Sequence, residues 1–256
     1  MIEHLFKIYI ELYRYYTGAD LPRKSAPRIE RVPSGIPGLD RLIQGGFVKG
    51  TCNLISGTAG TGKTIFASQY IWHGLQNGEK CLFLSFEENP DEIREAALDF
   101  GWDFKPYEKK GKLVLRYEEP SKIQMDPFYF REELKEKGYQ RIAVDSTSVM
   151  GFATDNLADV RKNLMTLISE LKRYGATSII TGEMEEGSEK ISRFGVEEFL
   201  VDGVIVLYFT GIGGEEGNNL QVRKMRRTKH AKGYFPLIFT KNGLKVGREG
   251  ISVLMK

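Results

Sequence analysis

Glycines and a lysine stand at a spacing that suits phosphate binding in residues 57–64. The stretch is Gly57, Thr58, Ala59, Gly60, Thr61, Gly62, Lys63 and Thr64, which fits the pattern GxxxxGK[ST]. Glycines let backbone N–H groups turn toward a phosphate, and the free amides of a following helix add attraction. Lys63 would then reach the β- and γ-phosphates, and the Thr64 hydroxyl would bind Mg²⁺. We therefore predict that these eight residues bind ATP.

Carboxylates follow two of the apolar stretches. RIAVD ends at Asp145, and KCLFLSF runs into Glu87 and Glu88. At the carboxyl end of a buried strand, Asp145 is expected to hold Mg²⁺ together with Thr64, although it could instead cap a turn. We expect Glu87 to orient the attacking water and Glu88 to support it, because adjacent strand residues point to opposite faces. The alternative is that both glutamates simply face solvent.

Basic residues crowd into one short segment near the C-terminus. Seven fall within ten positions: Arg223, Lys224, Arg226, Arg227, Lys229, His230 and Lys232. Strand alternation would place Lys224 and Arg226 on one face. The segment could be a solvated sheet edge, a nucleic-acid track, or a group that reaches the ATP of a neighbouring subunit. Spacing alone favours the solvated edge, since charge protects exposed strands from aggregation.

The elements that must position these residues alternate along the chain from residue 31 onward. Six apolar stretches are typical of strands: 51–56, 80–86, 113–117, 141–145, 177–182 and 203–209. Four stretches are typical of helices: 63–77, 90–100, 127–137 and 156–174. Nearly continuous apolar strands indicate a parallel sheet covered on both faces. The strands LQVRKMR and YFPLIFT follow without helices, so we predict an α/β fold with antiparallel strands at its C-terminal edge.

Composition and the N-terminus bound the remaining possibilities. The chain has 256 residues, a net charge of +3 and 41% hydrophobic residues, which is ordinary for a soluble protein. We predict an amphipathic helix at 2–16 with a linker, forming the segment 1–30, and one domain at 31–256. No run is long enough to span a bilayer or resembles a secretory signal, so a cytoplasmic protein is expected. Cys52 and Cys81 are expected to be buried thiols, and no zinc site is predicted.

Several motifs together resemble the KaiC-like ATPases of the RecA superfamily. They are RVPSGIPGLDRLIQGGFVKG, SFEENPDEI, ISRFGVEEFLVDGVIVL and KMRRTKH, and the resemblance covers roughly residues 31–248. It implies a RecA-like core that assembles as a ring, often a hexamer, with ATP between subunits. It also implies that Glu87 and Glu88 match paired catalytic glutamates, and that Lys224 and Arg226 reach across the interface to the γ-phosphate. Thr181 and Glu183 fall where the family senses nucleotide state.

Departures and alternatives limit what the resemblance implies. The circadian clock protein has two such domains in tandem, whereas this chain has one, so neither timekeeping nor autophosphorylation is carried over. A recombinase that binds single-stranded DNA would need basic loops. Of its two candidate loops, 146–156 carries no lysine or arginine, and 183–195 carries more acidic than basic residues. Binding to nucleic acid is therefore not favoured. A non-catalytic scaffold is disfavoured by the intact Lys63, Thr64, Glu87 and Asp145.

Overall fold

The computed structural model describes part of the N-terminal segment and most of the remaining chain. The described residues are 11, 14–16, 29–119, 131, 134–135, 137–152, 156–188, 190–209 and 217–248. Contacts divide the chain into two units, Met1–Glu30 and Arg31–Lys256. In the first unit residues 11 and 14–16 are helical, and the rings of Tyr15 and Tyr16 meet edge to face. The rest of the predicted helix 2–16 and most of the linker lie outside the described residues.

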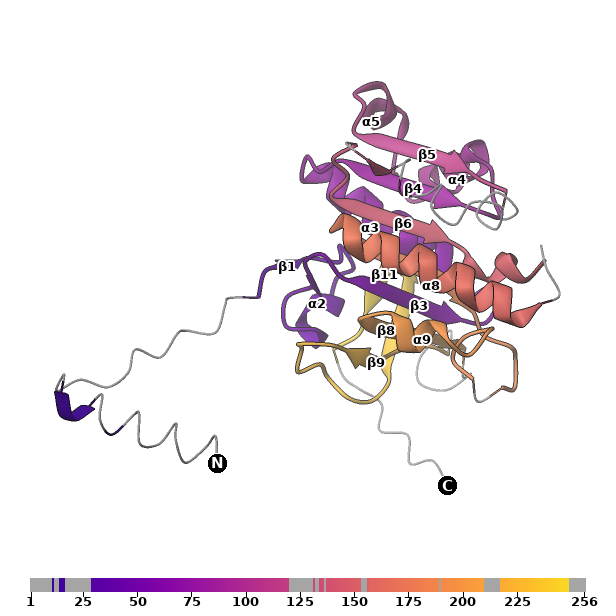
Figure 1. Ribbon diagram of the computed structural model, residues 1–256. Coiled ribbons are helices and arrows are strands. Elements are labelled where there is room, and N and C mark those ends of the chain that lie inside the picture. Colours follow the sequence, from indigo (N-terminus) through magenta and orange to yellow (C-terminus); the bar gives the residue numbers. More distant parts are fainter. Residues whose placement is uncertain are drawn as a thin grey trace. The chain divides into compact units, whose positions relative to one another are not determined.

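A nine-stranded sheet forms the centre of the second unit (Figure 1). Its order across the sheet is β11 (Gly243–Val246), β10 (Phe235–Thr240), β9 (Asn218–Met225), β8 (Gly203–Phe209), β3 (Cys52–Gly57), β7 (Thr177–Glu183), β6 (Arg141–Asp145), β4 (Cys81–Ser85) and β5 (Leu113–Tyr117). The strands from β8 to β5 are parallel, whereas β9, β10 and β11 pair antiparallel. The predicted α/β fold with an antiparallel C-terminal edge is confirmed.

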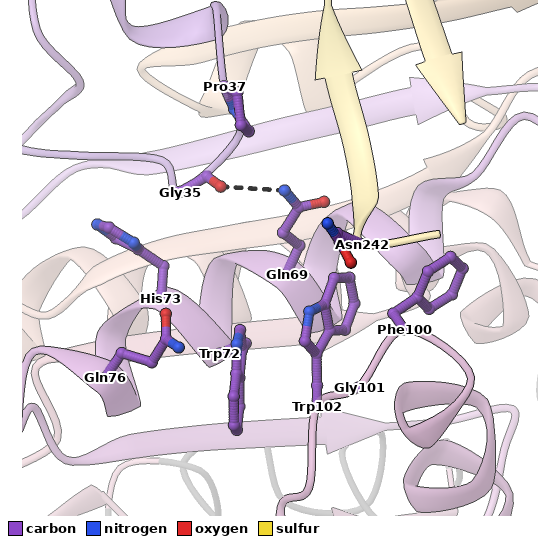
Figure 2. Close-up of a pocket in the computed structure, with 10 residues that line it drawn as sticks. All are labelled: Gly35, Pro37, Gln69, Trp72, His73, Gln76, Phe100, Gly101, Trp102 and Asn242. Atoms are coloured by element: carbon purple, nitrogen blue, oxygen red, sulfur yellow. Dashed lines mark hydrogen bonds between the residues drawn. The ribbon is translucent and has the colours of Figure 1, made fainter. Parts of the chain in front are cut away.

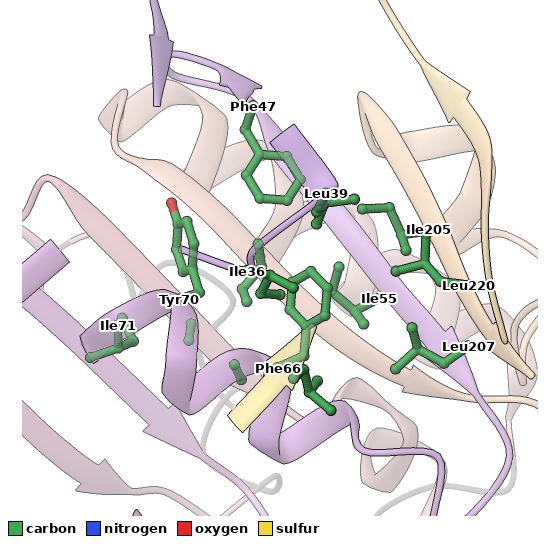
Figure 3. Close-up of a cluster of buried hydrophobic side chains, with 14 of the residues drawn as sticks. Ile36, Leu39, Phe47, Ile55, Phe66, Tyr70, Ile71, Ile205, Leu207 and Leu220 are labelled. Atoms are coloured by element: carbon green, nitrogen blue, oxygen red, sulfur yellow. The ribbon is translucent and has the colours of Figure 1, made fainter. Parts of the chain in front are cut away.

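Helices cover both faces of this sheet, and the strands supply alternate residues to each cover. Leu54 of β3 packs in the cluster that contains α8 (Leu157–Tyr174) and borders α9 (Glu197–Leu200). Its neighbour Ile55 packs in the opposite cluster, with α2 (Leu39–Leu42), α3 (Lys63–Gln76) and α4 (Pro90–Leu98) (Figure 3). Because successive strand residues point to opposite faces, one continuous apolar strand serves both layers.

Local sequence signals set the ends of the longer helices. Asn89 caps α4 by accepting hydrogen bonds from the backbone of Asp91 and Glu92, and the Glu92 side chain accepts from the backbone N–H of Asn89. This reciprocal arrangement fixes the turn that follows Glu88. Asn156 caps the start of α8, and Gly175, with φ +87°, ends it. These boundaries lie close to those predicted.

The short elements were not predicted. They are α2, α9, α5 (Lys105–Lys109), the 3₁₀ helix η1 (Thr147–Phe152), β11, and the two-stranded ribbon of β1 (Arg31–Val32) and β2 (Phe47–Val48). Most are too brief to show a hydrophobic period, so tertiary contacts decide them. The predicted helix 127–137 falls mostly outside the described residues.

Strand β9 contains an irregularity beside the basic segment. Val204 of β8 pairs with Lys224, but Ile205 pairs with Val222, so Arg223 is an additional residue in β9. The alternation changes phase there: Val222 and Met225, three residues apart, are both buried, while Arg223 is exposed. This is a β-bulge, which re-aims the residues that follow it.

Candidate functional site

The phosphate-binding pattern lies in the tight turn between β3 and α3. Gly60 and Gly62 have φ of +76° and +91°, a region that side chains rarely adopt. A Cβ atom on Gly57 would lie 2.7 Å from the carbonyl oxygen of Leu207, and one on Gly62 would lie 2.9 Å from the ring of Phe239. Glycine is therefore required at these positions by backbone geometry and by the closeness of β8 and β10. Helix α3 begins at Lys63, so its free amides face the turn.

Lys63 lies folded over this turn. Its Nζ donates to the carbonyl oxygen of Thr58 at 2.9 Å, and the Thr61 hydroxyl donates to the same oxygen at 2.8 Å. Burial lowers the pKa of Lys63, while the nearby carboxylates of Glu183, Asp145 and Glu87 act in the opposite direction. The ammonium group thus stands among acids at the start of α3, in a position to meet an anion.

Asp145 is the buried carboxylate of the site. Only 4% of the residue is exposed, and Thr181 of β7 donates a hydrogen bond to its Oδ1. Thr64 also forms a side-chain hydrogen bond with it. Burial raises the pKa of Asp145, and the two hydrogen bonds oppose that rise. The structure brings together the two residues that were predicted to hold Mg²⁺.

The residues present fit a magnesium ion. Mg²⁺ prefers oxygen ligands, keeps several waters, and is bound through one or two carboxylates together with substrate phosphates. A hydroxyl and a carboxylate in contact, Thr64 and Asp145, match that requirement beside the phosphate turn. A buried carboxylate whose charge is disfavoured by desolvation also gains from a cation.

The two glutamates after β4 differ in their surroundings. Glu87 is exposed, and its Oε1 accepts a hydrogen bond from the hydroxyl of Ser146. Glu88 is half-buried, and burial together with the charges of Asp145, Glu92 and Glu87 raises its pKa. The backbone N–H groups of both residues donate to the Ser85 hydroxyl, at 3.2 and 2.9 Å. The strand end therefore presents one anchored, solvent-facing carboxylate and one that is more easily protonated.

Serines and an arginine around these acids were not singled out in the sequence. Ser146 positions Glu87, and the Ser148 hydroxyl accepts from the backbone N–H of Glu183 at 2.6 Å. Arg193 forms an ion pair with Glu183 at 3.2 Å. The two serine contacts join residues that are 59 and 35 positions apart in the sequence. Local sequence spacing therefore gives no signal for them.

The predicted cationic pair lies at the other edge of the sheet. Lys224 Nζ donates to the carbonyl oxygens of Glu198 and Val201, and Arg226 forms an ion pair with Asp202 at 3.1 Å. The backbone N–H of Asp202 donates to Cys52, the first residue of β3.

The strand register keeps this pair away from the phosphate turn. Gly203 of β8 pairs with Asn53, four residues before Gly57, which corresponds to roughly 13 Å along the strand. The parallel strands finish at one side of the sheet, called the carboxyl edge, and begin at the opposite side, called the amino edge. The structure assembles five of the predicted residues at the carboxyl edge: Lys63, Thr64, Asp145, Glu87 and Glu88. It places Lys224 and Arg226 at the amino edge.

A hollow of about 340 Å³ lies along the exposed side of α3 (Figure 2). Aromatic rings and neutral amides surround it: Trp72, His73, Phe100, Trp102, Gln69, Gln76 and Asn242. The Gln69 amide bridges the loop at Gly35 to Leu244 of β11. The hollow was not predicted; its one signal in the sequence is the pair of aromatic residues that flanks Gly101.

Within the described residues, no helix is both long and apolar enough to cross a membrane.

Most of the chain is similar to known proteins. Residues 32–251 fit the family model described as "ATPase: KaiC". A UPF0273 protein of Aeropyrum pernix is 34% identical over 235 residues, covering 85% of this chain and 94% of that protein. The circadian clock protein KaiC3 of Synechocystis is 36% identical over 230 residues, covering 85% of this chain but 46% of that protein. The chain thus spans about half the length of this relative and of the circadian clock oscillator protein KaiC of Prochlorococcus marinus.

A solved structure agrees with the fold. The crystal structure of a KaiC-like protein from the hyperthermophilic archaeon Pyrococcus horikoshii superposes with a TM-score of 0.78 at 36% sequence identity. The match covers 86% of this chain and all of that one.

Proposed function

The chain belongs to the family of KaiC ATPases, and from this premise we propose that it binds ATP with Mg²⁺ and hydrolyses it at interfaces between identical subunits of a ring, often a hexamer in this family. The observation that carries the proposal is the separation of two groups of residues. Lys63, Thr64, Asp145 and Glu87 stand together at the carboxyl edge of the sheet. Lys224 and Arg226 stand at the amino edge of the same sheet.

The carboxyl-edge residues supply the binding half of the site. The backbone amides of 57–64 and the start of α3 would hold the phosphates, and Lys63 would move from the Thr58 carbonyl to the β- and γ-phosphates. Thr64 and Asp145 would hold Mg²⁺, whose role when bound is to offset charge on the phosphate oxygens. The alternative that Asp145 merely caps a turn is weakened by its burial and its contact with Thr64.

Glu87 is proposed as the group that prepares the water. Its carboxylate faces solvent and is held by Ser146, so a water on its free oxygen could be aimed at the γ-phosphorus. The water oxygen would bond to phosphorus, the bond from phosphorus to the β,γ-bridging oxygen would break, and Glu87 would accept the proton. Glu88, which is more easily protonated, would support rather than replace it.

The amino-edge cations supply the other half from a neighbouring subunit. Their strand register keeps them away from the phosphate turn of their own chain. In a ring that stacks the amino edge of one sheet against the carboxyl edge of the next, Lys224 and Arg226 would meet the γ-phosphate. An arginine supplied in this way accelerates related nucleotidases by roughly 10³–10⁵.

The hollow beside α3 is a candidate binding site for the adenine base of ATP. It shares α3 with the phosphate turn, and Asn242 belongs to the β10–β11 hairpin, whose Phe239 lies against Gly62. Aromatic rings with neutral amides suit a purine, which offers both a flat face and hydrogen-bonding edges.

Mixed assemblies test the proposal. Subunits with Arg226→Ala lack the cation given to a neighbour, and subunits with Glu87→Gln lack their own base. A mixture contains interfaces with an intact Glu87 on one side and an intact Arg226 on the other, so phosphate release should recover to a measurable fraction of wild type. Sizing the protein with and without ATP and Mg²⁺ checks the ring directly. No recovery in mixtures shown to contain both subunits would contradict the interfacial site.

Binding to DNA is the less favoured function. The loop 183–195 carries four acidic and two basic residues, and 146–156 carries no lysine or arginine. Such loops would repel a phosphate backbone. Titration of labelled single-stranded DNA at about 0.15 M salt tests this; tight binding at that ionic strength would revive the recombinase function.

A further inference from the structure

The part of the basic segment that follows β9, residues 226–232, is held in place by residues from the beginning of the domain. The guanidinium of Arg31 donates to the Thr228 hydroxyl at 3.0 Å and to the Arg227 carbonyl at 3.4 Å. Its Nη1 also donates to the carbonyl oxygens of Ile43 and Gly46, both at 3.0 Å. One side chain of β1 thus joins the turn before β2 to the segment after β9, almost 200 residues away.

Gln44 completes this connection from the turn between β1 and β2. Its Oε1 accepts from the backbone N–H of Lys229 at 2.9 Å and from Arg31 at 3.4 Å. Gln44 has φ +59°, an uncommon conformation for a residue other than glycine. The backbone N–H of Ala231 donates to the Leu42 carbonyl at 2.8 Å, which fixes the far end of the segment.

The acceptors for Arg31 are neutral oxygens, although the segment it holds is rich in cations. A planar guanidinium holds several oxygens in the fixed directions of its fork of donors, whereas the lysine ammonium is a compact charge on a flexible stem. Arg226 lies directly before this held stretch, and on its other side it is tied to Asp202 by its backbone N–H and its side chain. The Arg226 guanidinium also donates to the carbonyl oxygen of Phe199 at 3.3 Å. The direction of Arg226 therefore depends on three anchors: Asp202, Phe199 and the Arg31–Gln44 pair.

We propose that Arg31, assisted by Gln44, is a positioning residue that sets the direction of Arg226 toward the nucleotide of the neighbouring subunit. This inference rests on the interfacial role of Arg226 proposed above. It assigns the ribbon of β1 and β2 a part in catalysis without contact with ATP. Misplacement of a reacting group by about 1 Å costs on the order of 10²-fold in rate.

The test uses Arg31→Gln, with Arg41→Gln on the exposed side of the nearby α2 as matched control. We expect Arg31→Gln to lower kcat by about 10²-fold while KM for ATP stays close to wild type, because the phosphate turn is untouched. Arg31→Lys, which keeps the charge and loses the fork, should lower kcat as well. Circular dichroism and thermal unfolding establish that each variant is folded.

Mixing separates positioning from a general structural role. Arg31→Gln subunits mixed with Glu87→Gln subunits should regain phosphate release, because the Glu87→Gln subunits present a correctly directed Arg226 to intact sites. Recovery with Arg226→Ala but not with Arg31→Gln would overturn the present inference alone. Failure of both mixtures would overturn the interfacial site, and this inference with it.

A second variant keeps the proposal testable if Arg31→Gln does not fold. Gln44→Gly removes the amide that holds Lys229, and glycine accepts the positive φ without strain. We expect a several-fold fall in kcat, since the hydrogen bonds from Lys229 and from Arg31 are lost and each is worth roughly 0.5–1.5 kcal/mol. An unchanged kcat in folded Gln44→Gly together with unchanged kcat in Arg31→Lys would overturn the inference.

Discussion

The two edges of the sheet are built from different chemistry. At the carboxyl edge, ionisable side chains lie close together, with Lys63 among Asp145, Glu87 and Glu183. Burial disfavours the charged forms of both Lys63 and Asp145, because it lowers the pKa of the lysine and raises the pKa of the aspartate. At the amino edge, Lys224 and Arg226 are bound to backbone carbonyls and to Asp202. The carboxyl edge thus has charged groups that a ligand can reach, whereas the cations of the amino edge are held by several contacts within their own chain.

This difference suggests how the work is divided. A site that must accept a triphosphate and release its products benefits from groups that can rearrange, as Lys63 would on leaving the Thr58 carbonyl. A cation that must meet the phosphate of a neighbouring subunit, as proposed for Arg226, benefits from a rigid frame. The contacts around it then fix its direction before the two subunits meet. Mutations at the two edges should therefore fail in different ways.

The largest effect is expected from Lys63→Ala at the carboxyl edge. Removal of the ammonium group leaves the phosphates without their main counter-charge, so both ATP binding and phosphate release should fall to background. Nucleotide binding by fluorescence and a phosphate-release assay measure this, with Lys109→Ala on α5 as the control. Unchanged turnover would refute the assignment of residues 57–64.

Arg226→Ala at the amino edge should separate turnover from binding. We expect kcat to fall by about 10³-fold, the lower range for an arginine supplied across an interface, while ATP still binds. Comparison with Arg223→Ala, an exposed arginine of β9 three residues earlier, controls for the loss of one positive charge. Equal losses in the two variants would mean that net charge, not position, is responsible.

A smaller effect should appear at alkaline pH through Lys224. Burial and the charge of Arg226 lower its pKa, so the ammonium form is present at low pH and is lost, as pH rises, earlier than for an ordinary lysine. Activity should fall on the alkaline side by up to about tenfold, the effect of one charge-assisted hydrogen bond of roughly 1.5 kcal/mol. Lys224→Arg should move this fall to higher pH. An identical pH–rate profile would remove Lys224 from the mechanism.

The smallest effect is expected from Asn242→Ala in the hollow beside α3. Loss of one neutral hydrogen bond to a base, worth roughly 0.5–1.5 kcal/mol, should raise KM for ATP about threefold and leave kcat unchanged. The same assay with GTP gives the contrast, because the two bases differ at their hydrogen-bonding edges. A variant with wild-type KM would place the base elsewhere.

Much of the fold was accessible from sequence because its signals are local. The strands of the core are continuous apolar runs, and α3, α4 and α8 carry a glycine turn or side-chain caps at their starts. Elements that depend on distant partners were missed. The ribbon of β1 and β2, for example, has two residues in each strand and is held by Arg31 contacts to residues 227 and 228.

The candidate site was predictable to the extent that chemistry follows strand ends. Asp145 and the glutamates were found because a buried strand that ends in an acid is unusual, and the structure places Asp145 in contact with Thr64. Ser146, Arg31 and the hollow beside α3 could not be found in this way. Their contacts join segments that only the folded chain brings together.

The bulge at Arg223 lets β9 carry one residue more than β8 without turning the residues that follow to the wrong face. The residues on either side of Arg223 pair with adjacent residues of β8, so Arg223 has no opposite residue of its own. A deletion of Arg223 would restore regular pairing, keep Met225 in the core and leave Lys224 on the opposite face. Related sequences should therefore tolerate both a change of residue type at position 223 and the loss of this residue, and the loss would remove only the local bend that a bulge adds.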